Sequence, residues 1–135
     1  MKAWILERYG KTVALKLGEV PEPEPRDDEV LVKILASGVN ALDVKIAKGE
    51  FKAILPYRTP LILGHDVAGV VTRVGSKVRR FKVGDEVYSR PDDLHIRTFT
   101  EFIAIKEGSV AHKPQGLTME EAAATGLMPY PSAWA

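Results

Sequence analysis

The sequence predicts a mainly β fold, a small barrel or sandwich that forms one domain. Short runs rich in Val, Ile, Leu and aromatic residues recur along the chain, and turns containing Gly or Pro separate them. Only two short stretches have the composition of helices, near residues 41–48 and from residue 118 onward. A length of 135 residues is enough to bury one hydrophobic core.

The composition is that of a globular protein and excludes several kinds of site. Apolar residues make up 45% and charged residues 27%, and the formal net charge of +1 indicates no basic surface for nucleic acid or an anionic membrane. The chain has no cysteine, which excludes disulfides, Cys-based zinc sites and a thiol nucleophile within it. No apolar run reaches membrane-spanning length, and the first residues, MKAWILERYG, are not a signal peptide. A cytoplasmic location is therefore expected.

The first part of the chain predicts three strands and a connector. Residues 2–7 and 13–20 are predicted to pair as a hairpin, because a turn signal at Gly10 lies between them. The prolines of residues 21–29 (PEPEPRDDE) favour an extended, solvated connector. Residues 30–36 (VLVKILA) then predict a central strand.

The stretch from Gly64 to Val74 (GHDVAGVVTRV) is expected to be a buried strand around which the domain is organised. Its valines are β-branched, and Gly64 and Gly69 allow a close backbone approach or a bulge. His65 and Asp66 place two titratable side chains at the mouth of the strand, where polar groups on the rim of an apolar barrel can form a wall of an active site. The alternative, which these eleven residues alone slightly favour, is a surface His and a turn-forming Asp before an ordinary strand.

Shorter elements surround this strand. Residues 41–48 predict a short helix that ends at Gly49, and residues 50–63 predict an irregular loop. Thr118 and Glu121 have the spacing of a helix capping box. Further short strands are predicted at residues 86–88, 98–106 and 109–113.

Five motifs in this order resemble one known family. They are SGVNALDVKIAKGE, PLILGHDVAGVV, VGSKVRRFKVGDEVY, FTEFIAIKEGSVAHKP and LTMEEAAA. Together they resemble the N-terminal, GroES-like domain of the medium-chain dehydrogenase/reductase superfamily, a partly open β-barrel with a few short helices. Within it the chain looks most like the zinc-independent quinone oxidoreductases, including their mitochondrial reticulon-interacting relatives. The resemblance covers essentially the whole chain.

The resemblance implies a two-domain, NADPH-dependent oxidoreductase. Its GroES-like catalytic barrel, expected over residues 1–117, would form one wall of the substrate cleft. Residues 118–135 would begin the helix that connects the barrel to a Rossmann domain. No G-x-G-x-x-G follows a predicted strand here, so that domain is expected to be missing from this chain. NADPH would then be bound mainly by the missing domain, and this truncated domain would be inactive alone.

Zinc is not expected. In the zinc-dependent alcohol dehydrogenases of the superfamily, a Cys ligand stands where this chain has Asn40, a His ligand matches His65, and an acidic neighbour matches Asp66. An amide is a poor zinc ligand, and the family's four-Cys structural zinc loop is also missing. Weak metal binding remains open to His65 together with Asp43 or Asp66.

Asn40 and Asp43 are the leading candidates for the site. In quinone reductases the Asn that matches Asn40 lies beside the nicotinamide, which implies a catalytic and cofactor-binding role, and an amide can both donate and accept hydrogen bonds. The alternative is that Asn40 caps the following helix. Asp43 matches the acidic position of the family's GVN-x-x-D motif and would support Asn40 or the barrel mouth. It is otherwise a first-turn Asp favoured by the helix dipole.

His65 and Asp66 are further catalytic candidates, because they could form a polar pair near the reacting carbon. Within this pair, His65 is suited to donate a proton near neutral pH. Lys45 departs from the family, which often has Tyr or His there. It is a candidate contact for a cofactor phosphate or a substrate oxygen, or else a solvated surface Lys. Tyr57, in the long loop, is the candidate substrate-binding residue, and packing on the barrel is its alternative.

Two functions of different classes follow. The first is the substrate-side domain of an NAD(P)H-dependent oxidoreductase of the quinone, enone or aldehyde/alcohol class. The second is a stand-alone GroES-like interaction or folding module, and the retained motif around Asn40 and His65 disfavours it. The expected partner is a small carbonyl or quinone substrate, with neither nucleic acid nor a membrane. An apolar face where the missing domain would dock predicts self-association.

Overall fold

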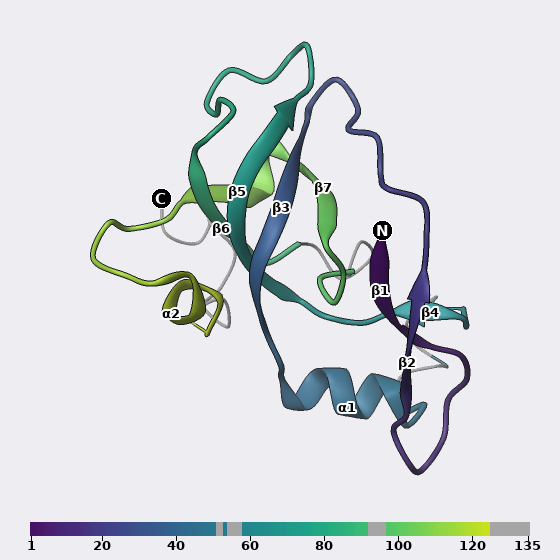
Figure 1. Ribbon diagram of the computed structural model, residues 1–135. Helices are drawn as coiled ribbons and strands as arrows, with labels where there is room; N and C mark the ends of the chain where they lie inside the picture. The colour runs from purple at the N-terminus through teal and green to yellow at the C-terminus, as the bar shows by residue number, and fades with distance from the viewer. Residues whose placement is uncertain (51–52, 54–57, 92–96, 125–135) are drawn as a thin grey trace.

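The computed structural model describes residues 1–50, 53, 58–91 and 97–124, which fold into two antiparallel sheets (Figure 1). The strands are β1 (Lys2–Leu6), β2 (Leu15–Glu19), β3 (Glu29–Gly38), β4 (Leu61–Ile62), β5 (Asp66–Val74), β6 (Glu86–Ser89), β7 (Phe102–Lys106) and β8 (Val110–His112). The helices are α1 (Ala41–Ala47) and α2 (Met119–Ala124), with a 3-10 turn, η1 (Glu107–Ser109). The mainly β class is therefore confirmed.

The larger sheet has the strand order β7-β3-β5-β6-β8, and the smaller one has the order β2-β1-β4. The larger sheet curls around an apolar core as a partly open barrel (Figure 1). All strand pairs among the described residues are antiparallel, so this part of the chain contains no parallel Rossmann sheet. The core residues are Val30, Val32, Val67, Val71, Val78, Phe81, Val87, Ile103, Ile105 and Val110.

The predicted central strands β3 and β5 are neighbours at the centre of the larger sheet. Gly69 stands opposite Ile34 and Gly38 opposite Asp66. A Cβ added at Gly69 would lie 2.0 Å from the carbonyl oxygen of Lys33, so the close backbone approach predicted there is confirmed. This pairing brings the C-terminal end of β3 next to the start of β5.

Helix α1 begins directly after β3. Asn40 is its N-cap residue, with the extended backbone (φ −118°, ψ 156°) typical of that position. The helix ends at Ala47, and Gly49 follows with φ +84°, the left-handed conformation that glycine adopts at low cost. The predicted helix and its glycine stop are therefore confirmed, and the buried face of α1 carries Asp43 as well as Ile46 and Ala47.

Helix α2 covers one face of the larger sheet. Ala122 and Ala123 are buried against Ala68 of β5. The predicted capping box precedes the helix: the Thr118 N–H donates to Glu121 Oε1 at 3.1 Å, and the Glu121 N–H donates to Thr118 Oγ1 at 3.1 Å.

Two strand predictions were wrong in detail. The loop predicted over residues 50–63 contains the two-residue strand β4, which pairs with β1. The strand predicted over residues 98–106 begins only at Phe102, because residues 98–100 run beside β1 instead, where the Trp4 N–H donates to the Phe99 carbonyl at 2.9 Å. Both differences arise from β1, a partner distant in sequence that no local pattern reveals.

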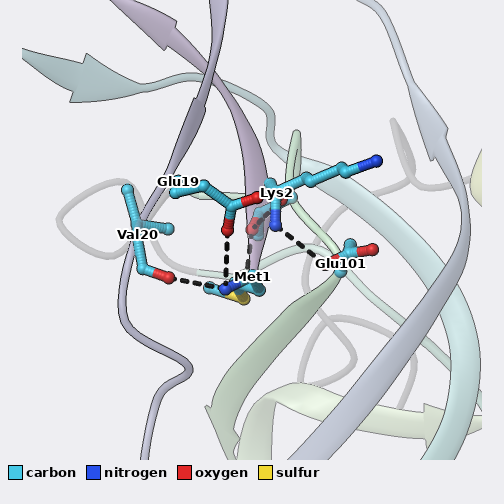
Figure 2. A network of polar contacts seen from close by, with 6 residues as sticks. Met1, Lys2, Glu19, Val20 and Glu101 are labelled. Atoms are coloured by element: carbon cyan, nitrogen blue, oxygen red, sulfur yellow. Dashed lines mark hydrogen bonds and ion pairs between the residues drawn. The ribbon is translucent and has the colours of Figure 1, made fainter.

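The start of β1 is held from both sides (Figure 2). The Met1 amino group donates to the Val20 carbonyl at 2.7 Å and lies 3.4 Å from Glu19 Oε2. On the other side, the Lys2 N–H donates to Glu101 Oε2 at 2.8 Å. Residues far apart in the chain thereby anchor the smaller sheet to the segment that leads into β7.

Candidate functional site

A buried carboxylate, Asp43, links α1 to the turn before β5. Its Oδ1 lies 2.7 Å from His65 Nδ1 and accepts the Gly64 N–H at 3.1 Å. Its Oδ2 accepts the Asn40 N–H at 2.9 Å. Asp43 and His65 are 2% and 1% exposed. Since a carboxylate only accepts hydrogen bonds, Asp43 selects the tautomer of His65 that carries a proton on Nδ1.

The side chain of Asn40 makes a second contact across the sheet. Its Nδ2 donates to Asp66 Oδ2, at the first residue of β5. Asn40 is half-buried, whereas Asp66 is 1% exposed. The amide therefore bridges the N-terminus of α1 and a buried carboxylate, so Asn40 is both the N-cap residue and a member of a polar cluster.

Asp66 lies in a mixed electrostatic environment. Burial raises the pKa of the Asp66 carboxyl above its ordinary value of 3.8. The hydrogen bond from Asn40 and the nearby charges of Arg90 and His65 act in the opposite direction, whereas Asp43 adds to the rise. Asp66 is thus a group whose proton equilibrium depends on each of its neighbours.

Two polar atoms of this cluster face no partner within the described part of the chain. They are His65 Nε2 and Asp66 Oδ1, and both are buried. Buried polar atoms are normally hydrogen-bonded, because leaving one without a partner costs about 1–3 kcal/mol. Together with the amide of Asn40, these atoms give the cluster an unusual capacity to bind a further polar group.

Gly64 shapes the turn that presents His65. Its φ is +106°, and a Cβ added there would lie 2.1 Å from Thr98 Oγ1 and 2.8 Å from a ring carbon of Phe99. The close approach predicted at Gly64 is confirmed. Thr98 is fully buried, and sequence reasoning missed it because nothing in the local pattern reveals that residues 98–99 pack over this turn.

The cluster brings together four of the predicted site residues, Asn40, Asp43, His65 and Asp66. Lys45 also lies on α1 but is exposed, on the opposite side from the buried Asp43 face. Tyr57 lies outside the described residues. Arg90, which follows β6, acts electrostatically on Asp66 and was missed by sequence reasoning, because only the pairing of β6 with β5 brings it there.

The cluster does not fit a catalytic zinc centre. Zinc favours thiolate and imidazole ligands, and this cluster has one imidazole and no thiolate. The Asp43 carboxylate already interacts with three nitrogen atoms, and the amide nitrogen of Asn40 is turned to Asp66. Among residues 1–50, 53, 58–91 and 97–124, no group of three or more His, Cys, Asp or Glu side chains is placed to hold a metal ion.

A separate groove is lined by β1 and β2 of the smaller sheet together with residues 98–101 and residues around the end of β3. It has a volume of about 640 Å³, and Trp4, Leu17, Val39 and Phe99 are among its lining residues. Trp4 and Leu17 face each other across β1 and β2, and both are about half exposed. Neither helix of the described residues is long and apolar enough to cross a membrane.

Comparisons with known proteins agree with this architecture. The alcohol dehydrogenase GroES-like domain family matches residues 26–115. The chain is 42% identical to 2-methylene-furan-3-one reductase from Solanum lycopersicum and 37% identical to the chloroplastic NADPH-dependent alkenal/one oxidoreductase from Arabidopsis thaliana. Each alignment covers 94% of this chain and 34% of the relative, so the chain spans about a third of the length of these relatives.

A solved structure extends the comparison. The Escherichia coli quinone oxidoreductase complexed with NADPH is 27% identical and superposes with a TM-score of 0.82, covering 93% of this chain and 37% of that one. The family match, the partly open barrel and the order of the motifs coincide. The chain therefore belongs to the alcohol dehydrogenase GroES-like domain family.

Proposed function

We propose that this chain forms the substrate-side wall of an NAD(P)H-dependent oxidoreductase that acts on a quinone, an enone or an aldehyde/alcohol. The observation that carries the proposal is the bridge between Asn40 and the buried Asp66, which fixes a polar amide at the end of the central strand β3. The names of the relatives, which include an alkenal/one and a quinone oxidoreductase, support this class of reaction.

The proposal divides the work between this chain and a second domain. Residues 1–117 act as the catalytic barrel, and residues 118–135 begin the connection to a dinucleotide-binding domain. The donors and acceptors of the cluster, including the buried His65 Nε2 and Asp66 Oδ1, fit the polar nicotinamide end of NADPH. NADPH supplies the hydride when it is bound.

The residues of the chain then have distinct tasks. Asn40 orients the reacting groups through its amide, and Asp66 holds that amide in place. Asp43 fixes the imidazole of His65 with a proton on Nδ1, so Nε2 is the acceptor nitrogen of the neutral ring. Nε2 hands a proton to the reduced substrate from the imidazolium, which carries a proton on both nitrogens. The apolar barrel behind the cluster excludes water from this side of the site.

Lys45 and Tyr57 complete the proposed site. Lys45 is exposed and long enough to move, and we assign it to a phosphate of the cofactor. Tyr57 is assigned to the substrate. The expected signature of Lys45→Ala is a higher KM for NADPH with little change in kcat, whereas Tyr57→Ala should raise the KM of the substrate.

The reaction is proposed to be independent of zinc, because the cluster offers a single imidazole and no thiolate. Element analysis of the purified protein should find less than one zinc per ten chains. Stoichiometric zinc in the wild type that is lost when His65 is replaced by Ala would contradict this part of the proposal.

A chimera tests the function. Residues 1–135 replace the corresponding third of the tomato reductase, and NADPH consumption is followed with enone and quinone substrates. We expect the chimera to turn over substrate. In the chimera, Asn40→Ala should lower kcat by about 100-fold. Lys48→Ala replaces an exposed lysine at the end of the same helix and should leave the rate unchanged. The 135 residues alone should fold and show no turnover. Robust turnover by them alone would contradict the proposed division of work.

The proposed location is the cytoplasm. A fluorescent protein fused after the last residue of the natural reading frame tests this location. Fluorescence in plastids or mitochondria would overturn the proposal.

A further inference from the structure

The pairing of β5 with β6 ends directly beside Asp66 and Arg90. Val67 faces Ser89 and Ala68 faces Tyr88 in the antiparallel register. Asp66 and Arg90 are the next residues along this register, beyond the last pair, and the charge of Arg90 reaches the Asp66 carboxylate. Directly opposed residues in an antiparallel pair have Cβ atoms about 4.5–5.5 Å apart and project from the same face. The sheet itself therefore brings a guanidinium to the carboxylate that holds Asn40.

This face of the sheet is enclosed. Ala68 and Tyr88, the pair two residues further along β5 and β6 from Asp66, pack with Ala122 and Ala123 of α2. Arg90 is half-buried, and Asp66 is buried. An arginine stays charged under all ordinary conditions, and partial burial weakens the screening of its charge by water. Its positive charge consequently acts on Asp66 more strongly than that of an exposed cation would.

The amide of Asn40 has two ends that differ in hydrogen bonding. An ionised carboxylate can only accept, so it selects the nitrogen end, and Nδ2 of Asn40 does donate to Asp66 Oδ2. A protonated carboxyl is also a donor and would accommodate the oxygen end. The charge on Asp66 therefore determines which end of the amide is turned toward β5 and which end is presented to the site.

We propose that Arg90 is a positioning residue of this site. From its place beside Asp66, it favours the charged carboxylate and so keeps the nitrogen end of the Asn40 amide turned toward β5. The catalytic meaning of that orientation rests on the proposed function, whereas the orientation itself is a structural property of this chain.

The other charged groups near Asp66 do not replace Arg90. His65 also favours the carboxylate, but it is engaged with Asp43, whose negative charge has the opposite effect. Tyr88 packs in the same cluster, and the α2 residues of that cluster, Met119, Ala122 and Ala123, carry no charge. Arg90 is the permanent cation among the groups that act on Asp66 in the described residues.

Nuclear magnetic resonance on the isotopically labelled 135-residue chain tests the inference. The Asp66 carboxyl carbon and the Asn40 side-chain N–H signals are followed together from acid to neutral pH. Arg90→Gln removes the charge, Arg90→Lys keeps it, and Arg8→Gln removes a charge from an exposed arginine as the matched control.

For Arg90→Gln we expect both signals to change at a higher pH than in the wild type, and to do so in step. Arg90→Lys and Arg8→Gln should keep the wild-type profile. In Asp66→Asn, the Asn40 signals should no longer depend on pH, with or without Arg90→Gln. A profile of Arg90→Gln that matches Arg8→Gln would overturn the inference, as would an Arg90→Lys profile that matches Arg90→Gln.

Two further outcomes are decisive. If Arg90→Gln does not fold, the Arg90→Lys profile decides, because a wild-type profile supports a role of charge and a shifted one refutes it. No step of the test requires turnover. A chimera without activity would therefore leave the positioning role intact, and a failed titration would leave the proposed reaction intact.

Discussion

Asp43 Oδ1 lies 2.7 Å from His65 Nδ1, and both side chains are buried. The same carboxylate accepts the N–H groups of Gly64 and Asn40. One side chain thus connects the first turn of α1 with the turn that leads into β5. The stability of the domain and the geometry of the candidate site consequently depend on the same residue.

Replacing Asp43 with Ala should destabilise the domain by about 3 kcal/mol, because it leaves a buried imidazole and two backbone N–H groups without their acceptor. Urea unfolding followed by fluorescence measures this free energy. Asp28→Ala, at an exposed aspartate, is the control and should change it by less than about 0.5 kcal/mol. Equal effects of the two substitutions would show that the buried carboxylate contributes nothing specific.

Replacing Gly64 with Ala should be more costly than replacing Gly84. Both glycines have a positive φ, +106° and +97°, so both substitutions carry a backbone penalty of about 1–2 kcal/mol. An alanine Cβ at position 84 meets nothing within 4 Å, whereas at position 64 it meets Thr98 Oγ1. We expect an additional loss of about 1–3 kcal/mol for Gly64→Ala in thermal or urea unfolding. Adding Thr98→Ala should recover part of it.

The pH dependence of stability should carry the signature of Asp66. Burial raises the pKa of this carboxyl in the folded state above 3.8, so the protonated form is favoured by folding. That contribution is fully present below about pH 3.8 and is lost as the pH rises through the folded-state pKa. The free energy of unfolding of the wild type minus that of Asp66→Asn should therefore fall over this range and then level off. A difference that rises with pH would contradict the direction of the shift.

Self-association should involve the groove on the smaller sheet. Trp4, Leu17 and Val39 expose 49%, 50% and 74% of their surface there, which favours burial against a second copy. Light scattering should show a mass that rises with concentration, and Leu17→Ser should reduce that rise. Val83→Ser, at a valine 62% exposed and outside the lining of the groove, is the matched control. A strict monomer at high concentration would contradict self-association.

Local patterns predicted the elements that depend on local chemistry. The β-branched residues of β3 and β5, the glycine after α1 and the capping box of α2 each act through neighbours close in sequence. Those elements were found at nearly the predicted boundaries. Strand β4 and the course of residues 98–100 were not predicted, because both are determined by pairing with β1, more than fifty residues away.

The residues of the candidate site were also predictable where a local motif marks them. Asn40, Asp43, His65 and Asp66 were identified from their motifs, and the structure brings them into one cluster. Their roles in a reaction stay predictions. Arg90 was missed because an arginine in a polar stretch resembles any solvated residue until the register of β6 against β5 is known. The residue types indicate which hydrogen-bonding and charged groups the chain has. Only the pairing of the strands indicates which of these groups lie next to one another.

The two-sided anchoring of β1 has a consequence for how the chain folds during synthesis. Glu101 accepts a hydrogen bond from residue 2, and the Phe99 carbonyl accepts one from Trp4. Strand β1 is synthesised before the segment around residue 100, so the edge of β1 away from β2 stays unpaired at Lys2–Trp4 until that segment arrives. Contacts of such long sequence separation form late. During that interval we expect a chaperone to bind the exposed apolar face formed by Trp4 and Leu17.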